Sequence, residues 1–311
     1  MPSVKIQPYY ITVKRASSRK EKASLPTESM EYSLVSALKK ISIDWYGSDH
    51  IYEHPIQNRD QYIYFKETNT IQEYAHEFIA NCAEHTNAAP VHDLKTKEKT
   101  HTISPEEAAF PHSYFQVRHK QNSTKALLCA LKIGRVSHRE VFWKCLSETF
   151  KHLYPGYVLS YAAVLNADVA KQYVENGALN EIEIIGHHLP ASVEKVMQPY
   201  LQGVSKDYSY KLKVIPHSVE KRFKNAANQR VSKFFDGGMS PSEIFSFTDP
   251  YHDVSVEVVI GGRKKRIVVS KAGFKGIDML IETTDYDHET GLPAISELRN
   301  ACNDIADEYF R

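Results

Sequence analysis

The stretch "DVSVEVVIGGRKKRIVVSK", residues 253–271, indicates how the last third of the chain folds. Two runs rich in valine flank the pair Gly261-Gly262, and a glycine pair between β-forming runs is typical of a tight hairpin turn. Alternation along the second strand puts Arg263 and Lys265 on the side of Ile267 and Val269, and turns Lys264 and Arg266 to the other side. The stretch therefore predicts a hairpin with four consecutive cations after its turn.

Segments with strand and helix patterns alternate through the rest of the chain. Two-residue alternation predicts strands over 6–14, 61–68, 113–120, 124–134, 157–165, 179–186, 208–216 and 276–284. Helical spacing predicts helices over 27–42, 70–85, 137–153 (with Ser137 as N-cap), from 166, after 190, over 217–235 and over 292–310. Residues 86–112 show little periodicity and are expected to form a long surface connection.

This mixture predicts an α+β fold with antiparallel hairpins, arranged in two or three units. The expected boundaries give an N-terminal unit over 1–112, a central unit over 113–216 and a C-terminal unit over 217–311. At 311 residues the chain is long enough for several packed cores.

The composition is that of an ordinary globular protein, with 42% hydrophobic and 25% charged residues. The longest apolar runs, over 126–131 and 157–165, fall far short of the roughly 20 residues of a membrane helix. The first residues lack the apolar core of a secretory signal, so a cytoplasmic location is expected. The four cysteines have no paired spacing and are expected to be reduced and buried: Cys82, Cys129, Cys145 and Cys302.

The formal net charge of +1 conceals a strong asymmetry along the chain. Residues 206–275 carry a net charge of +7, residues 276–311 carry −7, and the first 24 residues carry +5. Because local fields rather than the total charge steer binding, such a chain can still attract a polyanion.

The cations that we expect to contact nucleic acid fall into three groups. They are the run after the hairpin turn, the 217–235 helix, and the loop that follows the first strand. One charge run is usually only a solvated face, but phosphate neutralisation supplies most non-specific affinity, and a two-stranded ribbon fits a DNA groove. The expected DNA-binding residues are Arg263, Lys264, Lys265, Arg266, Lys221, Arg222, Lys224, Arg230, Lys14, Arg15, Arg19 and Lys20.

Motifs for catalysis are weak. The segment "HIYEH" over 50–54 has the spacing of an inverted zinc-peptidase motif, but Pro55 disfavours a helix there and the segment is rich in β-formers, so we expect a strand without metal. No glycine-rich phosphate loop is present. The sequence predicts no cofactor, no metal site and no small-molecule substrate.

Several segments together are similar to RexA-like phage-exclusion proteins, the DNA-binding half of the Rex pair of temperate phage. They are "YYITVKRASSRKEK" (9–22), "HIYEHP" (50–55), "YIYFKETN" (62–69), "FPHSYFQV" (110–117), "GRVSH" (134–138), "YKLKVIPHSVEKRFKNAA" (210–227) and "DVSVEVVIGG" (253–262). The resemblance implies a cytoplasmic homodimer that binds double-stranded DNA with little sequence preference, has no catalytic activity, and aborts infection together with a membrane protein encoded beside it.

Two other classes of function remain open at this point. One is a defence nuclease that depends on a metal, although Val259 stands where the lysine of a Glu-x-Lys pair would follow Glu257. The other is a protein-interaction adaptor that uses the same charges on an acidic partner and does not bind DNA.

Overall fold

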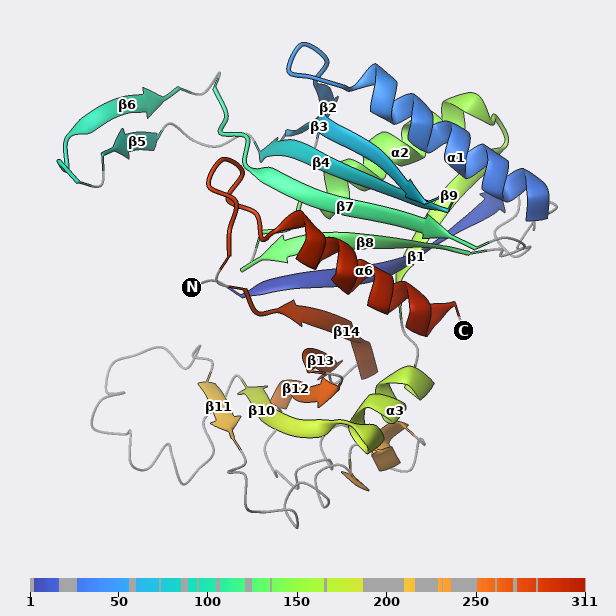
Figure 1. Cartoon of the computed structure of the whole chain (residues 1–311), viewed down its shortest axis with the longest axis vertical. Coiled ribbons are helices and arrows are strands. Elements are labelled where there is room, and N and C mark those ends of the chain that lie inside the picture. Colours follow the sequence, from blue (N-terminus) through green and yellow to red (C-terminus); the bar gives the residue numbers. More distant parts are fainter. Residues whose placement is uncertain are drawn as a thin grey trace. The chain divides into compact units, whose positions relative to one another are not determined.

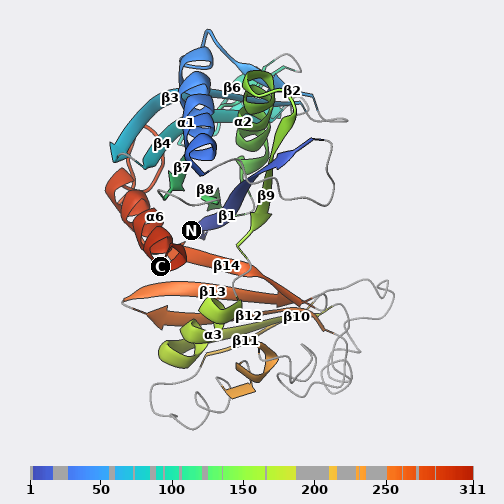
Figure 2. The same cartoon turned by 90° about the vertical axis from the view of Figure 1, so that its right-hand side faces the viewer.

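Figures 1 and 2 show the computed structural model of the chain. The structure describes residues 3–310 apart from 17–26, 56–59, 73, 85–88, 94, 105–106, 121–124, 135, 165–166, 187–209, 216–228, 231, 236–250, 261, 271–272 and 284. The chain forms two compact units. Unit 1 comprises residues 1–162 and 282–311, and unit 2 comprises residues 163–281.

Unit 1 is built on a sheet with strand order β9-β1-β8-β7-β4-β3-β2. The registered neighbours from β1 through β2 are all antiparallel, which fits the α+β class that the sequence predicts. The strands are β1 (Val4–Arg15), β2 (Tyr52–His54), β3 (Gln61–Gln72), β4 (Ala75–Glu84), β7 (His112–His119), β8 (Ala126–Ile133) and β9 (Tyr157–Ala163).

Three helices cover the two faces of this sheet (Figure 2). Helices α1 (Thr27–Asp44) and α2 (Arg139–Leu153) lie on one face, and α6 (Ile295–Tyr309) lies on the other. Adjacent residues of β4 show the division, because Phe78 packs on Phe142 of α2 while Glu77 bonds Arg299 of α6. The aromatic core on the α2 face and the buried stripe of α1 form the interior of unit 1.

The helix that the spacing predicts over 70–85 is not found in the described residues, where 70–72 end β3 and 75–84 form β4. Residues 75–84 form β4, which is paired with β3 on one side and with β7 on the other. Every residue from Ala75 to Ala83 is buried, because helices cover both faces of this central strand. A strand that is buried on both faces has no polar alternation, so its apolar residues can match a helical period.

The expected long connection over 86–112 contains a small hairpin, β5 (Ala89–His92) and β6 (Lys99–Ile103). Figure 1 shows that this hairpin stands away from the large sheet of unit 1. Asp93 stabilises its turn by accepting bonds from the main-chain N–H groups of Lys95 and Thr96. The segment is therefore an exposed two-stranded arm.

The strands of unit 2 follow the order β11-β10-β12-β13-β14, and neighbouring strands pair antiparallel. Helix α3 (Ala167–Asn176) packs against β12, and its Val174 belongs to a buried cluster that also contains Val256 and Ile267. The strands are β10 (Ala178–Gly186), β11 (Tyr210–Val214), β12 (Tyr251–Ile260), β13 (Arg263–Ser270) and β14 (Gly273–Ile281).

The quoted hairpin is confirmed as β12–β13. Ile260 pairs with Arg263, which leaves a two-residue turn, and Gly262 in that turn has a φ of 77°. A positive φ is readily adopted by glycine and rarely by other residues. The side assignment is also confirmed, since Ile267 and Val269 are fully buried.

Other expectations from the sequence had different outcomes. The strands and helices expected over 6–14, 27–42, 61–68, 137–153, 157–165, 179–186 and 292–310 are confirmed with shifted ends. The N-cap of α2 is His138 rather than Ser137, and it makes no side-chain capping bond. The expected unit boundaries at 112 and 216 do not coincide with the observed division, and β4, in the expected first unit, pairs with β7, which begins at His112 and runs into the expected second unit. The helix expected after 190 lies outside the described residues.

Candidate nucleic-acid interface

Lys265, expected to contact DNA, is buried in unit 2. It is only 3% exposed. Its Nζ donates to the Tyr173 hydroxyl at 2.9 Å and lies 4.1 Å from the centre of the Tyr173 ring on α3. A buried ammonium needs such partners, because removal of its hydration costs several kcal/mol. Lys265 therefore supports the packing of α3 and is not exposed at a surface.

Lys264 and Arg266, on the other side of β13, form ion pairs within the sheet. The Arg266 guanidinium lies 3.1 Å from a carboxylate oxygen of Glu257 and 3.9 Å from one of Glu181. Lys264 lies 3.9 Å from Glu257. Since Glu257 stands directly opposite Arg266 in the β12–β13 register, the pairing follows from the hairpin itself.

The same face extends to the edge strand β11 with more ion pairs. Lys213 bonds Glu181 at 2.9 Å, and Lys211 lies 2.8 Å from Glu183. Glu183 and Glu257 are only 5% and 6% exposed, so the acids of this face are covered while the lysines of β11 reach solvent. Two cations of the basic run, Lys264 and Arg266, are thus paired with carboxylates of β10 and β12.

The remaining expected residues are dispersed. Arg263 is half-buried near the turn, Lys14 is half-buried in β1, and Arg230 is exposed in a helical stretch at 229–230. The main chain of Arg15 ends β1. Arg19, Lys20, Lys221, Arg222 and Lys224 lie outside the described residues. The expected loop group thus belongs to unit 1 and the hairpin group to unit 2, and most of the expected helix group lies outside the described residues.

A different cationic surface lies in unit 1, on the face of the sheet that carries α2. Lys5 in β1 stands directly opposite Lys132 in β8. Alternation puts Gln7 and Tyr9 on the same side of β1 as Lys5. Both lysines are half-buried. We call this surface the β1–α2 patch and define it as Lys5, Gln7, Tyr9, Lys132, Arg139 and Tyr161.

Arg139, at the start of α2, forms the centre of the patch. Its guanidinium stacks over the Tyr9 ring at 4.6 Å and lies 5.5 Å from the Tyr161 ring, and it also donates to the Tyr9 hydroxyl. Its charge is partly offset by Glu140 at 3.5 Å, which in turn accepts a bond from Tyr161. Cation–π and hydrogen-bond contacts thus hold the arginine in one orientation, with 29% of its side chain exposed.

The patch is not visible as a charge run, because its cations come from three separate elements. The signal in the sequence is the alternation Lys5-Gln7-Tyr9 along one strand. This alternation puts a cation and an aromatic on one face. Lys132 joins the patch because the β1–β8 register places it opposite Lys5, and Arg139 joins it because α2 packs beside Tyr9.

Three further observations concern the described residues. No three His, Cys, Asp or Glu side chains in the described part of the chain are grouped to hold a metal ion. The "HIYEH" segment includes β2, as expected from the sequence, with Glu53 exposed. No described helix is long and apolar enough to span a membrane.

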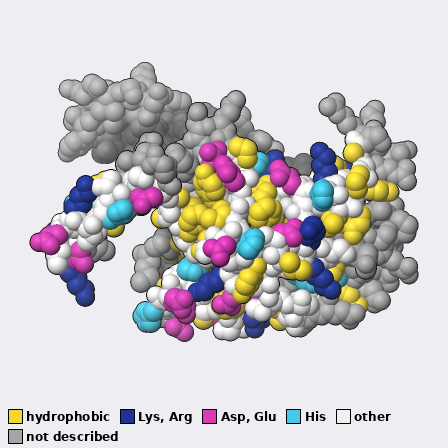
Figure 3. Space-filling model, turned by 90° about the horizontal axis from the view of Figure 1, so that it is seen from above, with side chains coloured by type: hydrophobic (Ala, Val, Ile, Leu, Met, Phe, Trp, Pro, Cys, Tyr) yellow, Lys and Arg dark blue, Asp and Glu magenta, His cyan; other side chains and the backbone are white. Residues whose placement is uncertain are grey.

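Figure 3 shows a face of the molecule on which hydrophobic side chains gather among charges of both signs. Large apolar side chains are exposed where α1 ends and β2 begins: Ile43 is 73%, Tyr46 52% and Ile51 41% exposed. A contiguous exposed apolar patch is typical of an interaction surface, and these three side chains lie within nine positions of the sequence.

In the comparisons with known proteins, no protein-family model matches the chain, and no curated protein matches it significantly.

Proposed function

We propose that the chain is a sequence-nonspecific double-stranded DNA-binding protein and that the β1–α2 patch contacts the phosphate backbone. The observation that carries this proposal is the cross-strand pair Lys5 and Lys132, on the same side of β1 as Tyr9, which orients the guanidinium of Arg139. The cationic run of the hairpin carries less weight, because Lys265 is buried and Lys264 and Arg266 form ion pairs.

Electrostatics supports this choice of surface. Two lysines that stand opposite each other on neighbouring strands can bind neighbouring phosphates of a polyanion, and binding releases the counterions of those phosphates. From Lys5 to Tyr9 the patch extends about 13 Å along β1, while duplex DNA carries about one charge per 1.7 Å of its axis. Several phosphates are thus within reach, and no base-specific contact is required.

The resemblance to RexA-like proteins supports the wider setting of the proposal. In this setting the protein acts in the cytoplasm as a non-enzymatic part of a phage-exclusion system that aborts infection. A membrane protein encoded beside it would be its partner. The exposed side chains of Ile43, Tyr46 and Ile51 support a homodimer, which light scattering of the Ile43→Asp, Ile51→Asp variant tests. A monomer in the wild type would contradict the dimer.

The experiment that tests DNA binding is a gel-shift titration on random duplex at several salt concentrations. Replacement of Lys5 and Lys132 by alanine is expected to reduce the slope of log K against log salt by about 2, since each phosphate contact contributes about 0.9. The matched control replaces Lys95 and Lys99, two exposed lysines of the β5–β6 arm. An unchanged slope in the first variant, or an equal loss in the control, would remove the patch from the interface.

The same protein preparation tests the nuclease alternative. Incubation of supercoiled plasmid with Mg²⁺ or Mn²⁺ is expected to leave the plasmid intact. Nicking that EDTA abolishes would contradict the non-enzymatic proposal. Absence of any duplex binding at low salt would favour the protein-interaction adaptor instead.

A further inference from the structure

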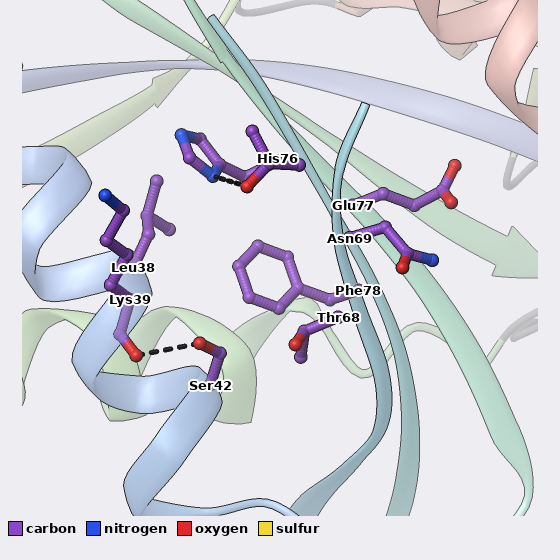
Figure 4. Close-up of a pocket in the computed structure, with 9 residues that line it drawn as sticks. Leu38, Lys39, Ser42, Thr68, Asn69, His76, Glu77 and Phe78 are labelled. Atoms are coloured by element: carbon purple, nitrogen blue, oxygen red, sulfur yellow. Dashed lines mark hydrogen bonds between the residues drawn. The ribbon is translucent and has the colours of Figure 1, made fainter. Parts of the chain in front are cut away.

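A hollow of about 40 Å³ opens to solvent beside α1 in unit 1, and none of the residues that line it belongs to the β1–α2 patch. Figure 4 shows residues that line it: Leu38, Lys39 and Ser42 from one turn of α1, with Thr68 from β3 and His76 and Phe78 from β4. Sites for drug-sized ligands usually have volumes of about 300–1,000 Å³ and are mainly apolar. A smaller hollow with an ammonium, hydroxyls and an imidazole at its wall suits one small polar group.

The imidazole of His76 is the unusual member of this wall. The residue is only 5% exposed. Its Nδ1 lies 3.4 Å from the Thr70 hydroxyl, and its Nε2 is buried with no hydrogen-bond partner among the described residues. The ring stacks on His119 with a centroid distance of 5.9 Å and an interplanar angle of 16°, so it is held in place. A buried polar atom that has no bond is costly, and a ligand that supplies the bond recovers that free energy.

The local field favours an anion. Burial, the neighbouring His119 and the charge of Lys39 lower the pKa of His76 to about 4, so the ring is neutral near pH 7. Glu77 is the acidic residue among those that line the hollow, and its carboxylate does not weaken the attraction of an anion to Lys39. Figure 4 shows that its side chain points away from His76, and it accepts bonds from Arg299 and Tyr114 on the other face of the sheet. An anion would therefore meet Lys39 without meeting a free carboxylate.

We propose that this hollow binds a tetrahedral oxyanion, a phosphate group in chemical class, through the Lys39 ammonium and the Nε2 of His76. If the Thr70 hydroxyl donates to Nδ1, the ring proton lies on Nε2, which then donates to an oxygen of the anion. Lys39 supplies the opposite charge at the rim. The site is independent of the β1–α2 patch, so it goes beyond the proposed function and can fail or succeed separately.

The test uses the full chain with sulfate and inorganic phosphate as probes, followed by NMR of ¹⁵N-labelled histidine. Sulfate keeps its charge near neutral pH, so any pH dependence belongs to the protein. Saturable shifts of the His76 ring resonances are expected, together with a rise in its pKa, because the bound negative charge stabilises the imidazolium. Lys39→Met is expected to weaken sulfate binding about fivefold or more.

The matched control is Lys40→Met, one residue along the same helix, where the lysine forms an ion pair with Asp44 at 2.9 Å. This variant is expected to bind sulfate like the wild type. His76→Gln tests the buried donor, and Lys39→Met keeps the test valid if the His76 variant does not fold. Linear shifts without saturation, or equal losses in Lys39→Met and Lys40→Met, would overturn the proposal.

A second arm identifies the source of the phosphate group. Duplex DNA and free phosphate are titrated separately against the wild type and Lys39→Met. Loss of sulfate affinity with unchanged duplex affinity assigns the site to a free anion or a small phosphorylated molecule. Loss of sulfate affinity and of duplex affinity assigns the site to the DNA backbone. Either result supports the anion site. If Lys39→Met keeps both affinities, the proposal is overturned.

Discussion

Arg299 of α6 and Glu77 of β4 form a bidentate ion pair between residues 222 positions apart. The Nη2–Oε1 distance is 2.9 Å and the Nε–Oε2 distance is 3.1 Å. The hydroxyl of Tyr114 also donates to Glu77 at 2.8 Å, and Glu77 is only 1% exposed. Helix α6 thus supplies the counterion of a buried carboxylate of β4.

Removal of this arginine is expected to destabilise unit 1. Arg299→Ala leaves a buried carboxylate without its cation and should lower the free energy of unfolding by about 3 kcal/mol. The double variant Glu77→Gln, Arg299→Met should recover part of that loss. The control is Arg118→Ala, which removes a bond to the neutral amide of Asn303 on the same helix and should cost about 1 kcal/mol. Urea denaturation measures all three, and equal losses for the two arginines would contradict the role assigned to the buried charge.

Lys265 is expected to matter for stability and not for DNA affinity. Lys265→Ala removes a buried side chain, its bond to Tyr173 and the contact with the ring, so unit 2 should lose about 2 kcal/mol. Lys265→Met keeps most of the volume and should lose less. Denaturation followed by circular dichroism, beside a gel shift at one salt concentration, separates the two effects. Weaker DNA binding by a fully folded Lys265→Met variant would contradict this prediction and show that the β12–β13 hairpin contributes to DNA binding.

The four cysteines are expected to be unreactive in the folded chain. Cys82, Cys129, Cys145 and Cys302 are fully buried. Burial raises the pKa of the Cys82, Cys145 and Cys302 thiols, and the thiolate is the reactive form. A thiol reagent should therefore label them slowly at neutral pH and rapidly in guanidinium. Fast labelling of any thiol in the native protein would show that its covering element opens.

Stability should fall on mild acidification, partly through His76. The pKa of His76 is about 4 in the folded chain and 6.5 ordinarily. Between these two values the unfolded chain binds a proton at this residue and the folded chain does not. The stabilisation is complete above about pH 6.5 and is lost as the pH falls toward 4, with a slope of up to about 1.4 kcal/mol per pH unit.

The pH effect is measured by urea denaturation across this range without added phosphate or sulfate. His76→Gln should reduce the slope, although burial also lowers the pKa of His138 and leaves a residual slope in the same direction. The exposed His152 provides the control in His152→Gln. A wild-type slope retained in His76→Gln would contradict the assignment.

Much of the fold could be predicted from local patterns. Apolar alternation with glycine at the turn predicts the β12–β13 hairpin, and the helical stripe of α1 predicts the buried residues Leu34, Leu38 and Ile41. The segment of β4 could not be predicted in this way. Coverage on both faces removes the alternation that distinguishes a strand, and that coverage comes from α1, α2 and α6, which are distant in sequence.

The surroundings of the cations that follow the hairpin turn were even less predictable from local sequence patterns. The sequence by itself determined that Arg263, Lys264, Lys265 and Arg266 follow a tight turn, and which of them share a side, because strand geometry is local. Only the tertiary structure decided that Lys265 lies beneath Tyr173, 92 residues away, and that Glu181 of β10 faces Arg266. It also paired Lys5 with Lys132 across β1 and β8 and stacked Arg139 of α2 on Tyr9 of β1. Ion pairing depends on distances through space, and those distances exist only once the sheets have formed.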